Sequence, residues 1–127
     1  MVYVKSFRDL DVYKLTREVT REIYIMSKGF PVEERYSLTD QIRRSSRSIG
    51  AQIAESWGKR RYELHFVSKL TDADSEQLET QHWIEISEEC SYIDSEKSIS
   101  LLQKCESIGK MIQSMIDKSS AFCKNNI

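Results

Sequence analysis

Glu79 and His82 stand in a Glu-x-x-His spacing, an arrangement that could serve metal chemistry. On a helix this spacing brings both side chains to one face, as in carboxylate-bridged di-iron bundles. Such a site needs a second Glu-x-x-His on another helix and two further inward-facing glutamates. The other histidine, His65, has Tyr62 rather than a carboxylate three residues before it. We therefore expect a structural or solvated His82, with no bound metal and no other cofactor.

The remaining nucleophiles and thiols show no catalytic pattern. Cys90, Cys105 and Cys123 are widely spaced, with no Cys-x-x-Cys pair that would favour zinc. We expect three reduced thiols, with Cys105 in the core. The sequence contains neither Gly-x-Ser-x-Gly nor a glycine-rich phosphate loop. The sequence therefore predicts a protein that is not an enzyme.

A cluster of basic residues is the stronger chemical feature. Six cations lie between positions 43 and 61, opposed there only by Glu55: Arg43, Arg44, Arg47, Lys59, Arg60 and Arg61. The planar guanidinium group binds phosphate through two parallel hydrogen bonds, so such a cluster favours polyanions. Trp57 and Tyr62 flank the last three cations and could stack on bases. This pattern predicts a surface that binds RNA or DNA.

A second interpretation explains the same arginines without any nucleic acid. Residues 65–94 hold eight carboxylates and a single lysine, so a basic helix face could pair with this acidic segment. The net charge of −1 and the isoelectric point near 6.1 argue against a strong, constitutive nucleic-acid binder. The alternative function is a structural or protein–protein interaction bundle with no nucleic-acid role.

Long helices must position these residues. One proline and four glycines in 127 residues favour helices over strands and turns. Apolar residues recur with helical period in four stretches, at approximately 9–28, 38–57, 60–91 and 96–123. The third stripe turns polar at Gln77 and Thr80, which indicates either an internal hydrogen-bond network or a contact with another subunit.

Polar residues and glycine mark the predicted helix ends. Ser6 and Asp9 are spaced as a capping box before the first stretch, and Ser37 and Asp40 before the second. Gly58 stands where a glycine commonly terminates a helix.

Four amphipathic helices with short connections predict an all-α fold, an up-down antiparallel four-helix bundle formed by one domain over residues 1–127. No apolar run approaches the roughly 18 residues of a membrane span. No secretory signal is visible at the N-terminus. We expect a cytoplasmic protein without a membrane role.

The sequence around the arginines resembles a known family. Residues 41–55 read QIRRSSRSIGAQIAE, similar to the pattern Q-I-R-R-A-x-x-S-I-x-x-N-I-A-E of the four-helix bundle proteins encoded in intervening sequences of bacterial 23S ribosomal RNA genes. Three further motifs match in order and spacing: Phe7-x-x-Leu10-x-Val12-Tyr13-Lys14, Phe30-Pro31 with Glu34-x-Tyr36-x-Leu38, and Ser75-x-x-Leu78-Glu79-Thr80-Gln81. The resemblance covers about residues 7–92, and the fourth helix matches only in pattern. Gln52 replaces the usual Asn, and Ser56 replaces a small Gly or Ala.

The resemblance implies a fold and a set of partners. It implies a bundle that assembles into a barrel-like homopentamer. The accessory protein of diversity-generating retroelements is similar to this family, and it binds nucleic acid and a reverse transcriptase. The implied partners are therefore further copies of the chain, RNA or DNA, and a protein such as a reverse transcriptase.

A second, polar face accompanies the apolar stripe of the second helix. Its members follow one another at steps of three or four residues: Gln41, Arg44, Ser48, Gln52 and Glu55. This face is rotated by about 100° from the apolar stripe, the turn of one residue. We expect it to meet either the third helix, where Glu79 lies, or a neighbouring subunit.

Overall fold

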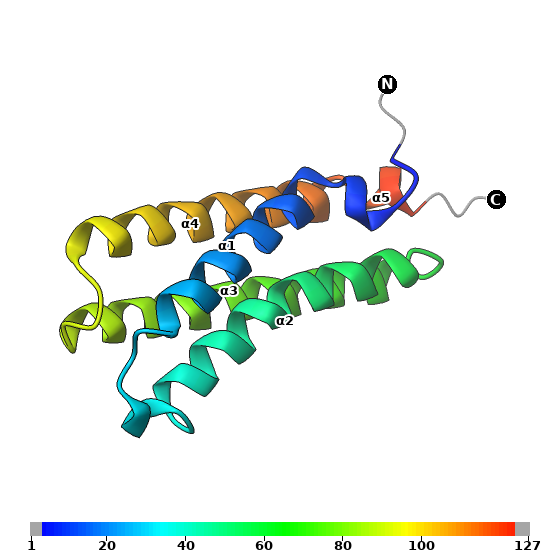
Figure 1. Ribbon diagram of the computed structural model, residues 1–127. Coiled ribbons are helices and arrows are strands. Elements are labelled where there is room, and N and C mark those ends of the chain that lie inside the picture. The colour runs from blue at the N-terminus through cyan, green and yellow to red at the C-terminus, as the bar shows by residue number, and fades with distance from the viewer. Residues whose placement is uncertain (1–3, 124–127) are drawn as a thin grey trace.

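Four long helices make up most of the chain (Figure 1). The computed structural model describes residues 4–123. The long helices are α1 Asp11–Ser27, α2 Leu38–Gly58, α3 Glu63–Glu89 and α4 Ser95–Asp117. Three short helical turns accompany them: η1 Phe7–Asp9, η2 Val32–Glu34 and α5 Ser119–Phe122. Residues 4–123 contain no strand, which confirms the predicted all-helical class.

Each long helix packs against two others, in the cyclic order α1, α2, α3, α4. Consecutive helices run in opposite directions, so the connections are short and lie at the two ends of the molecule (Figure 1). The turn α5 packs against α3 at the end that carries the α2–α3 connection. No helix within residues 4–123 is both long and apolar enough to cross a membrane.

The apolar stripes meet in one central core. Its largest fully buried side chains come from all four long helices and include Ile23, Ile49, Phe66, Leu70 and Ile108. Burying one such side chain stabilises the fold by about 1.5–3 kcal/mol. Cys105 is also fully buried, as predicted, and this burial raises the pKa of its thiol to about 12. All three cysteines are free thiols.

Hydrogen bonds within the bundle account for the polar centre of α3. The hydroxyl groups of Ser45 and Thr80 lie 2.9 Å apart between α2 and α3, and both residues are fully buried. Gln77 donates to Asp74 at 3.0 Å and accepts from Gln81 at 2.7 Å. A methyl group added at Gly109 of α4 would lie 2.9 Å from Gln77 Nε2, so glycine permits this close approach. Of the two explanations predicted for this polar stripe, the internal hydrogen-bond network is present.

The helix ends differ in part from the prediction. The Ser6 hydroxyl caps η1 by accepting from Arg8 N at 3.2 Å, and α1 begins later, at Asp11. Residues 60–62 form the turn before α3, and the fourth predicted helix is divided into α4 and α5. The capping box predicted at Ser37 is wrong, because its side chain makes no capping hydrogen bond.

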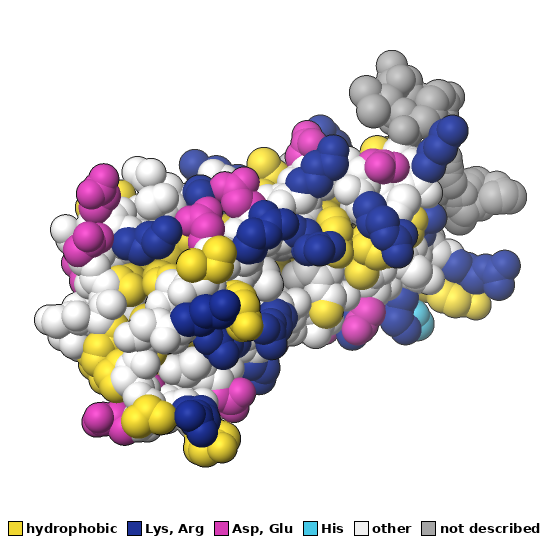
Figure 2. Space-filling view, viewed as in Figure 1, with side chains coloured by type: hydrophobic (Ala, Val, Ile, Leu, Met, Phe, Trp, Pro, Cys, Tyr) yellow, Lys and Arg dark blue, Asp and Glu magenta, His cyan; other side chains and the backbone are white. Residues whose placement is uncertain are grey.

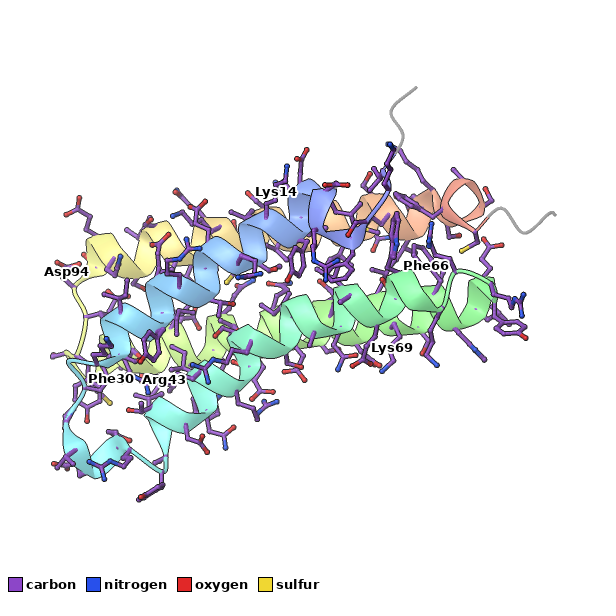
Figure 3. All side chains as sticks on the ribbon, turned by 45° about the vertical axis from the view of Figure 1, so that its right-hand side comes forward. Lys14, Phe30, Arg43, Phe66, Lys69 and Asp94 are labelled. Atoms are coloured by element: carbon purple, nitrogen blue, oxygen red, sulfur yellow. The ribbon has the colours of Figure 1, made fainter. Side chains whose placement is uncertain are left out.

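Glu34 takes over the capping of α2 and joins the two connections at this end of the bundle. One carboxylate oxygen accepts from Leu38 N at 3.2 Å, and the other accepts from the Tyr92 hydroxyl at 2.8 Å. This hydrogen bond raises the pKa of Tyr92 to about 12. The rings of Tyr92 and Phe30 lie 5.4 Å apart. Asp94, the residue before α4, caps this helix by accepting from Lys97 N (Figure 3).

The left-handed residue that ends a helix is a serine and not the predicted glycine. Gly58 is the last residue of α2, and no glycine within residues 4–123 has a positive φ. Ser91 has φ 61° and follows Cys90, the C-cap residue of α3. Ser91 N donates to Glu88 O and Tyr92 N donates to Ser87 O, both at 2.9 Å, the pattern of a Schellman motif.

Replacing Ser91 by Gly should stabilise the protein, because a side chain in the left-handed region costs about 1–2 kcal/mol and glycine avoids that cost. The flexibility of glycine in the unfolded chain offsets part of the gain, so we expect about 1 kcal/mol or less. Urea unfolding measures the difference. The control is Gly58→Ala, which needs no left-handed conformation and meets no atom within 4 Å. A loss of stability in Ser91→Gly would contradict the assignment.

Candidate nucleic-acid interface

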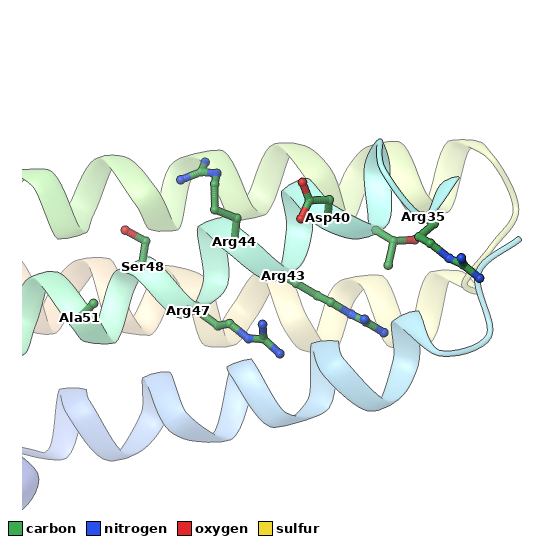
Figure 4. A pocket seen from close by; sticks show the side chains of 8 residues that line it. Arg35, Asp40, Arg43, Arg44, Arg47, Ser48 and Ala51 are labelled. Atoms are coloured by element: carbon green, nitrogen blue, oxygen red, sulfur yellow. The ribbon is translucent and has the colours of Figure 1, made fainter. Parts of the chain in front are cut away.

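The arginines of α2 reach different neighbours because successive residues of a helix point about 100° apart. Arg43 and Arg47 extend toward α1, whereas Arg44 extends toward α3 (Figure 4). Neighbouring arginines of the basic cluster therefore have different interaction partners.

Arg44 is held by carboxylates of α3. Its guanidinium group lies 2.5 Å from Glu79 and 3.4 Å from Glu76. Trp83 Nε1 also donates to Glu79, at 3.0 Å. The hydrogen bond from Arg44, together with the one from Trp83, holds the pKa of Glu79 below its ordinary value. The same pairing raises the pKa of Arg44, so this arginine is committed to the α2–α3 contact.

Two further members of the polar face of α2, Gln52 and Glu55, also contact α3. Lys69 Nζ of α3 lies 2.7 Å from Glu55 and donates to Gln52 Oε1 at 3.2 Å. The contacts of Arg44, Gln52 and Glu55 lie between α2 and α3, the first of the two partners expected for this face. Gln41 accepts from Arg44 Nε at 3.5 Å within α2, and Ser48 lines the groove on the outer side of α2.

Arg43 and Arg47 surround an aromatic ring of α1 instead of a carboxylate. Arg43 Nε donates to Ser27 Oγ at 2.7 Å. The guanidinium carbons of Arg43 and Arg47 lie 4.8 and 5.7 Å from the centre of the Tyr24 ring, and Lys28 Nζ lies at 4.8 Å. Tyr24, Lys28, Arg43 and Arg47 are called the Tyr24 cluster below. Among residues 4–123, no salt bridge joins its three cations to a carboxylate.

An open groove of about 560 Å³ runs along the outer side of α2 beside this cluster (Figure 4). Its charged lining consists of four arginines and one carboxylate: Arg35, Arg43, Arg44, Arg47 and Asp40. The face formed by α1 and α2 carries many Lys and Arg side chains with apolar atoms between them (Figure 2). This combination of cations and aromatic surface suits a phosphate backbone with attached bases.

The cations at positions 59–61 lie elsewhere, in the turn between α2 and α3. At 1.5 Å per residue, about 25 Å of helix separates them from Arg43. Arg60 stacks 3.6 Å above the Trp57 ring and donates to Trp57 O at 2.9 Å. Trp57 is therefore covered and does not offer the predicted stacking surface. Lys59, Arg61 and Tyr62 are exposed and form a separate basic tip.

Sequence reasoning missed Tyr24 and Lys28. They stand four residues apart on α1, a spacing that places both on one helix face. That spacing is a weak signal, because only the packing of α1 against α2 brings Arg43 and Arg47 to the same ring.

The Glu-x-x-His pair does not assemble a metal site. Glu79 is engaged by Arg44 and Trp83, while His82 is exposed, with its ring 4.7 Å from that of Trp83. Within residues 4–123, no three His, Cys, Asp or Glu side chains are grouped to hold a metal ion.

The fold and this site define a four-helix bundle protein with a basic flank on α1 and α2. The chain belongs to the 23S rRNA-intervening sequence protein family, whose model matches residues 8–114. The resemblance seen in the sequence is thus confirmed. A crystal structure of a protein with unknown function from the S23 ribosomal protein family, from Bacteroides thetaiotaomicron, is similar, with a TM-score of 0.74 and 29% identity. The match covers 84% of this chain and 95% of that one. The curated proteins include no significant match.

The contribution of the Arg44–Glu79 pair to the free energy of unfolding should depend on pH. The pKa of Glu79 lies below its ordinary value of 4.5 in the folded protein, so its contribution to stability is complete above pH 4.5. The contribution is lost as the pH falls through the lower, folded pKa. We expect Glu79→Gln to lower the free energy of unfolding by about 1 kcal/mol or less at pH 7, and by less in acid.

Urea unfolding between pH 7 and pH 3 measures this difference. The matched control is Glu85→Gln on α3, because Glu85 has no salt-bridge partner within residues 4–123. Equal stability losses in the two variants at every pH would contradict a specific role for the pair.

Proposed function

We propose that this protein is a non-enzymatic, homo-oligomeric module that binds RNA or DNA through the basic flank of α1 and α2. The observation that carries the proposal is the Tyr24 cluster, where three cations surround a tyrosine without a carboxylate partner in residues 4–123. Cations held close together repel one another, and a polyanion relieves this repulsion. Phosphate groups suit the guanidinium donors of Arg43 and Arg47.

The alternative function is a bundle without a nucleic-acid role. It requires the arginines of α2 to form salt bridges with the carboxylates of α3. That pairing is present for Arg44 alone among Arg43, Arg44 and Arg47. Two of the three carboxylates of α1, Glu18 and Glu22, are engaged on the other side of that helix, where they pair with Lys104 of α4. This distribution of partners favours the nucleic-acid proposal.

Assembly into a homopentamer is the second part of the proposal. It rests on the family resemblance and on apolar side chains that remain uncovered on α3 and α4. Leu78 and Ile99 are each 55% exposed. Repetition of the basic flank around a ring would convert a weak contact per subunit into useful avidity, provided that the flanks face one nucleic acid together.

The double substitution Arg43→Gln with Arg47→Gln should weaken RNA binding and its salt dependence. Each lost phosphate contact lowers the slope of log affinity against log salt by about 0.7 for a single strand, so we expect a decrease of about 1.4. Filter binding of a single-stranded oligouridine of about 20 nucleotides, between roughly 50 and 200 mM salt, measures the slope.

Two controls make this experiment specific. Lys110→Gln with Lys118→Gln removes two exposed charges on and after α4 and should leave the affinity nearly unchanged. Arg61→Gln tests whether the basic tip contributes separately. If the wild-type protein binds neither single-stranded RNA nor duplex DNA at the lower salt, the nucleic-acid proposal is wrong and the alternative function stands.

Light scattering tests the assembly. Five chains of 14.9 kDa give about 75 kDa, and we expect this mass at micromolar protein near neutral pH. Replacing Leu78 by Glu should lower the mass if α3 lies in the subunit interface, because a buried charge without a partner is unfavourable. A mass of one chain for the wild-type protein would contradict the proposed oligomer.

A further inference from the structure

A small pocket lies where α1 ends and α2 begins, beside the Tyr24 cluster. It measures about 270 Å³, and its lining includes Lys28, Arg35 and Arg43 but no carboxylate. These three cations come from three segments of the chain: the end of α1, the turn after η2, and α2. Phe30 forms part of the wall, and it lies close to Arg43 at this end of the bundle (Figure 3).

Thr39 is the buried polar residue of this pocket. Its side chain lines both the pocket and the adjoining groove, and the residue is only 8% exposed. The hydroxyl groups of Ser27 and Ser46 donate to carbonyl groups of their own helices. No hydrogen bond within residues 4–123 involves the Thr39 hydroxyl, and this hydroxyl is not sealed from solvent, since the only buried side-chain atom without a partner in these residues is Ser98 Oγ. The Thr39 hydroxyl can therefore donate to a ligand in the pocket without breaking a contact within the protein.

Two of the three cations, Arg43 and Lys28, contact other side chains before any ligand arrives. Arg43 is fixed by its hydrogen bond to Ser27 and by the ring of Tyr24, which also lies under Lys28. The Nη groups of Arg43 have no hydrogen-bond partner within residues 4–123 and are available as donors. Preorganised donors bind more tightly because less conformational freedom is lost on binding.

The size and charge of the pocket restrict its ligand. Pockets for whole organic ligands measure about 300–1,000 Å³, so this one suits a single compact group. Three cations and one hydroxyl donor match a dianion with several oxygen atoms. We propose that Lys28, Arg35, Arg43 and Thr39 form a binding site for a phosphate dianion, supplied either as inorganic phosphate or as the terminal phosphate of a nucleic acid.

The terminal phosphate would deepen the proposed function, on which that part of the inference rests. A phosphate inside a nucleic-acid chain carries one charge and two ester links. A terminal phosphate carries nearly two charges at neutral pH and a single link, so it can enter a pocket while the chain leaves through one opening. Thr39 and Arg43 line both cavities, so a chain held by its end would continue into the groove along α2.

Calorimetric titration with inorganic phosphate, against chloride at equal ionic strength, tests the site itself. We expect one site per chain in the wild-type protein. Affinity should fall about tenfold or more in Thr39→Val, which keeps the side-chain shape, and in Arg35→Gln. Arg35 is exposed, so this second variant tests the site without disturbing the core. Lys110→Gln is the control and should bind phosphate as the wild-type protein does. An equal, weak signal in all four proteins would mean an adventitious ion only and would overturn the inference.

A second arm identifies the source of the phosphate. Two oligouridines of the same length, one with a 5′-phosphate and one with a 5′-hydroxyl, are compared by competition. Tighter binding of the phosphorylated strand, with the preference lost in Thr39→Val, assigns the site to nucleic-acid ends. Phosphate binding without any end preference assigns it to free phosphate.

The two proposals fail separately. If both strands bind equally well and inorganic phosphate does not bind, the pocket inference is overturned while the proposed function stands. If inorganic phosphate binds but neither strand does, the pocket is supported and the nucleic-acid function is overturned.

Discussion

Successive side chains of α2 point about 100° apart, and this rotation decides what each arginine can reach. The helix lies between α1 and α3, and both neighbours must be packed at once. Arg44 turns toward α3 and meets Glu76 and Glu79, whereas Arg43, one residue earlier, turns toward α1. The polar network with α3 and the open cations beside α1 both follow from this division.

The charge on the α1 side remains available because the carboxylates lie elsewhere. Glu18 and Glu22 of α1 face α4, where Lys97 and Lys104 pair with them. The position that faces Arg43 and Arg47 is occupied by Tyr24, whose ring attracts cations without neutralising them. A chain with a net charge of −1 can therefore present a basic flank.

The spacing of apolar residues along the sequence predicts much of the fold, but it does not predict much of the site. The stripe containing Ile42, Ile49 and Ile53 predicts α2 because a helix buries every third or fourth residue. The cap of α2 was mispredicted because Glu34, four residues before Leu38 and fixed by Tyr92, displaces the local Ser37 cap. Such a competition depends on tertiary contacts.

The sequence also does not show where each basic residue lies in the folded protein. Arg43 and Arg60 appear as one cluster in the sequence, but most of the length of α2 separates them. Tyr24 is marked only by its four-residue spacing from Lys28, and the place of Thr39 in a pocket becomes visible only once its surroundings are known. Sequence spacing identifies residues on one helix face, whereas a site formed by two helices depends on how they pack.

NMR of the arginine side chains tests whether Arg43 and Arg47 are available to a ligand while Arg44 is held by α3. The Nε–Hε signals of Arg43, Arg44 and Arg47, assigned through single arginine-to-lysine variants, can be followed while single-stranded RNA is added. We expect the signals of Arg43 and Arg47 to shift with RNA, while that of Arg44 stays in place because Glu79 holds its guanidinium group. A shift of Arg44 with unchanged signals of Arg43 and Arg47 would contradict it.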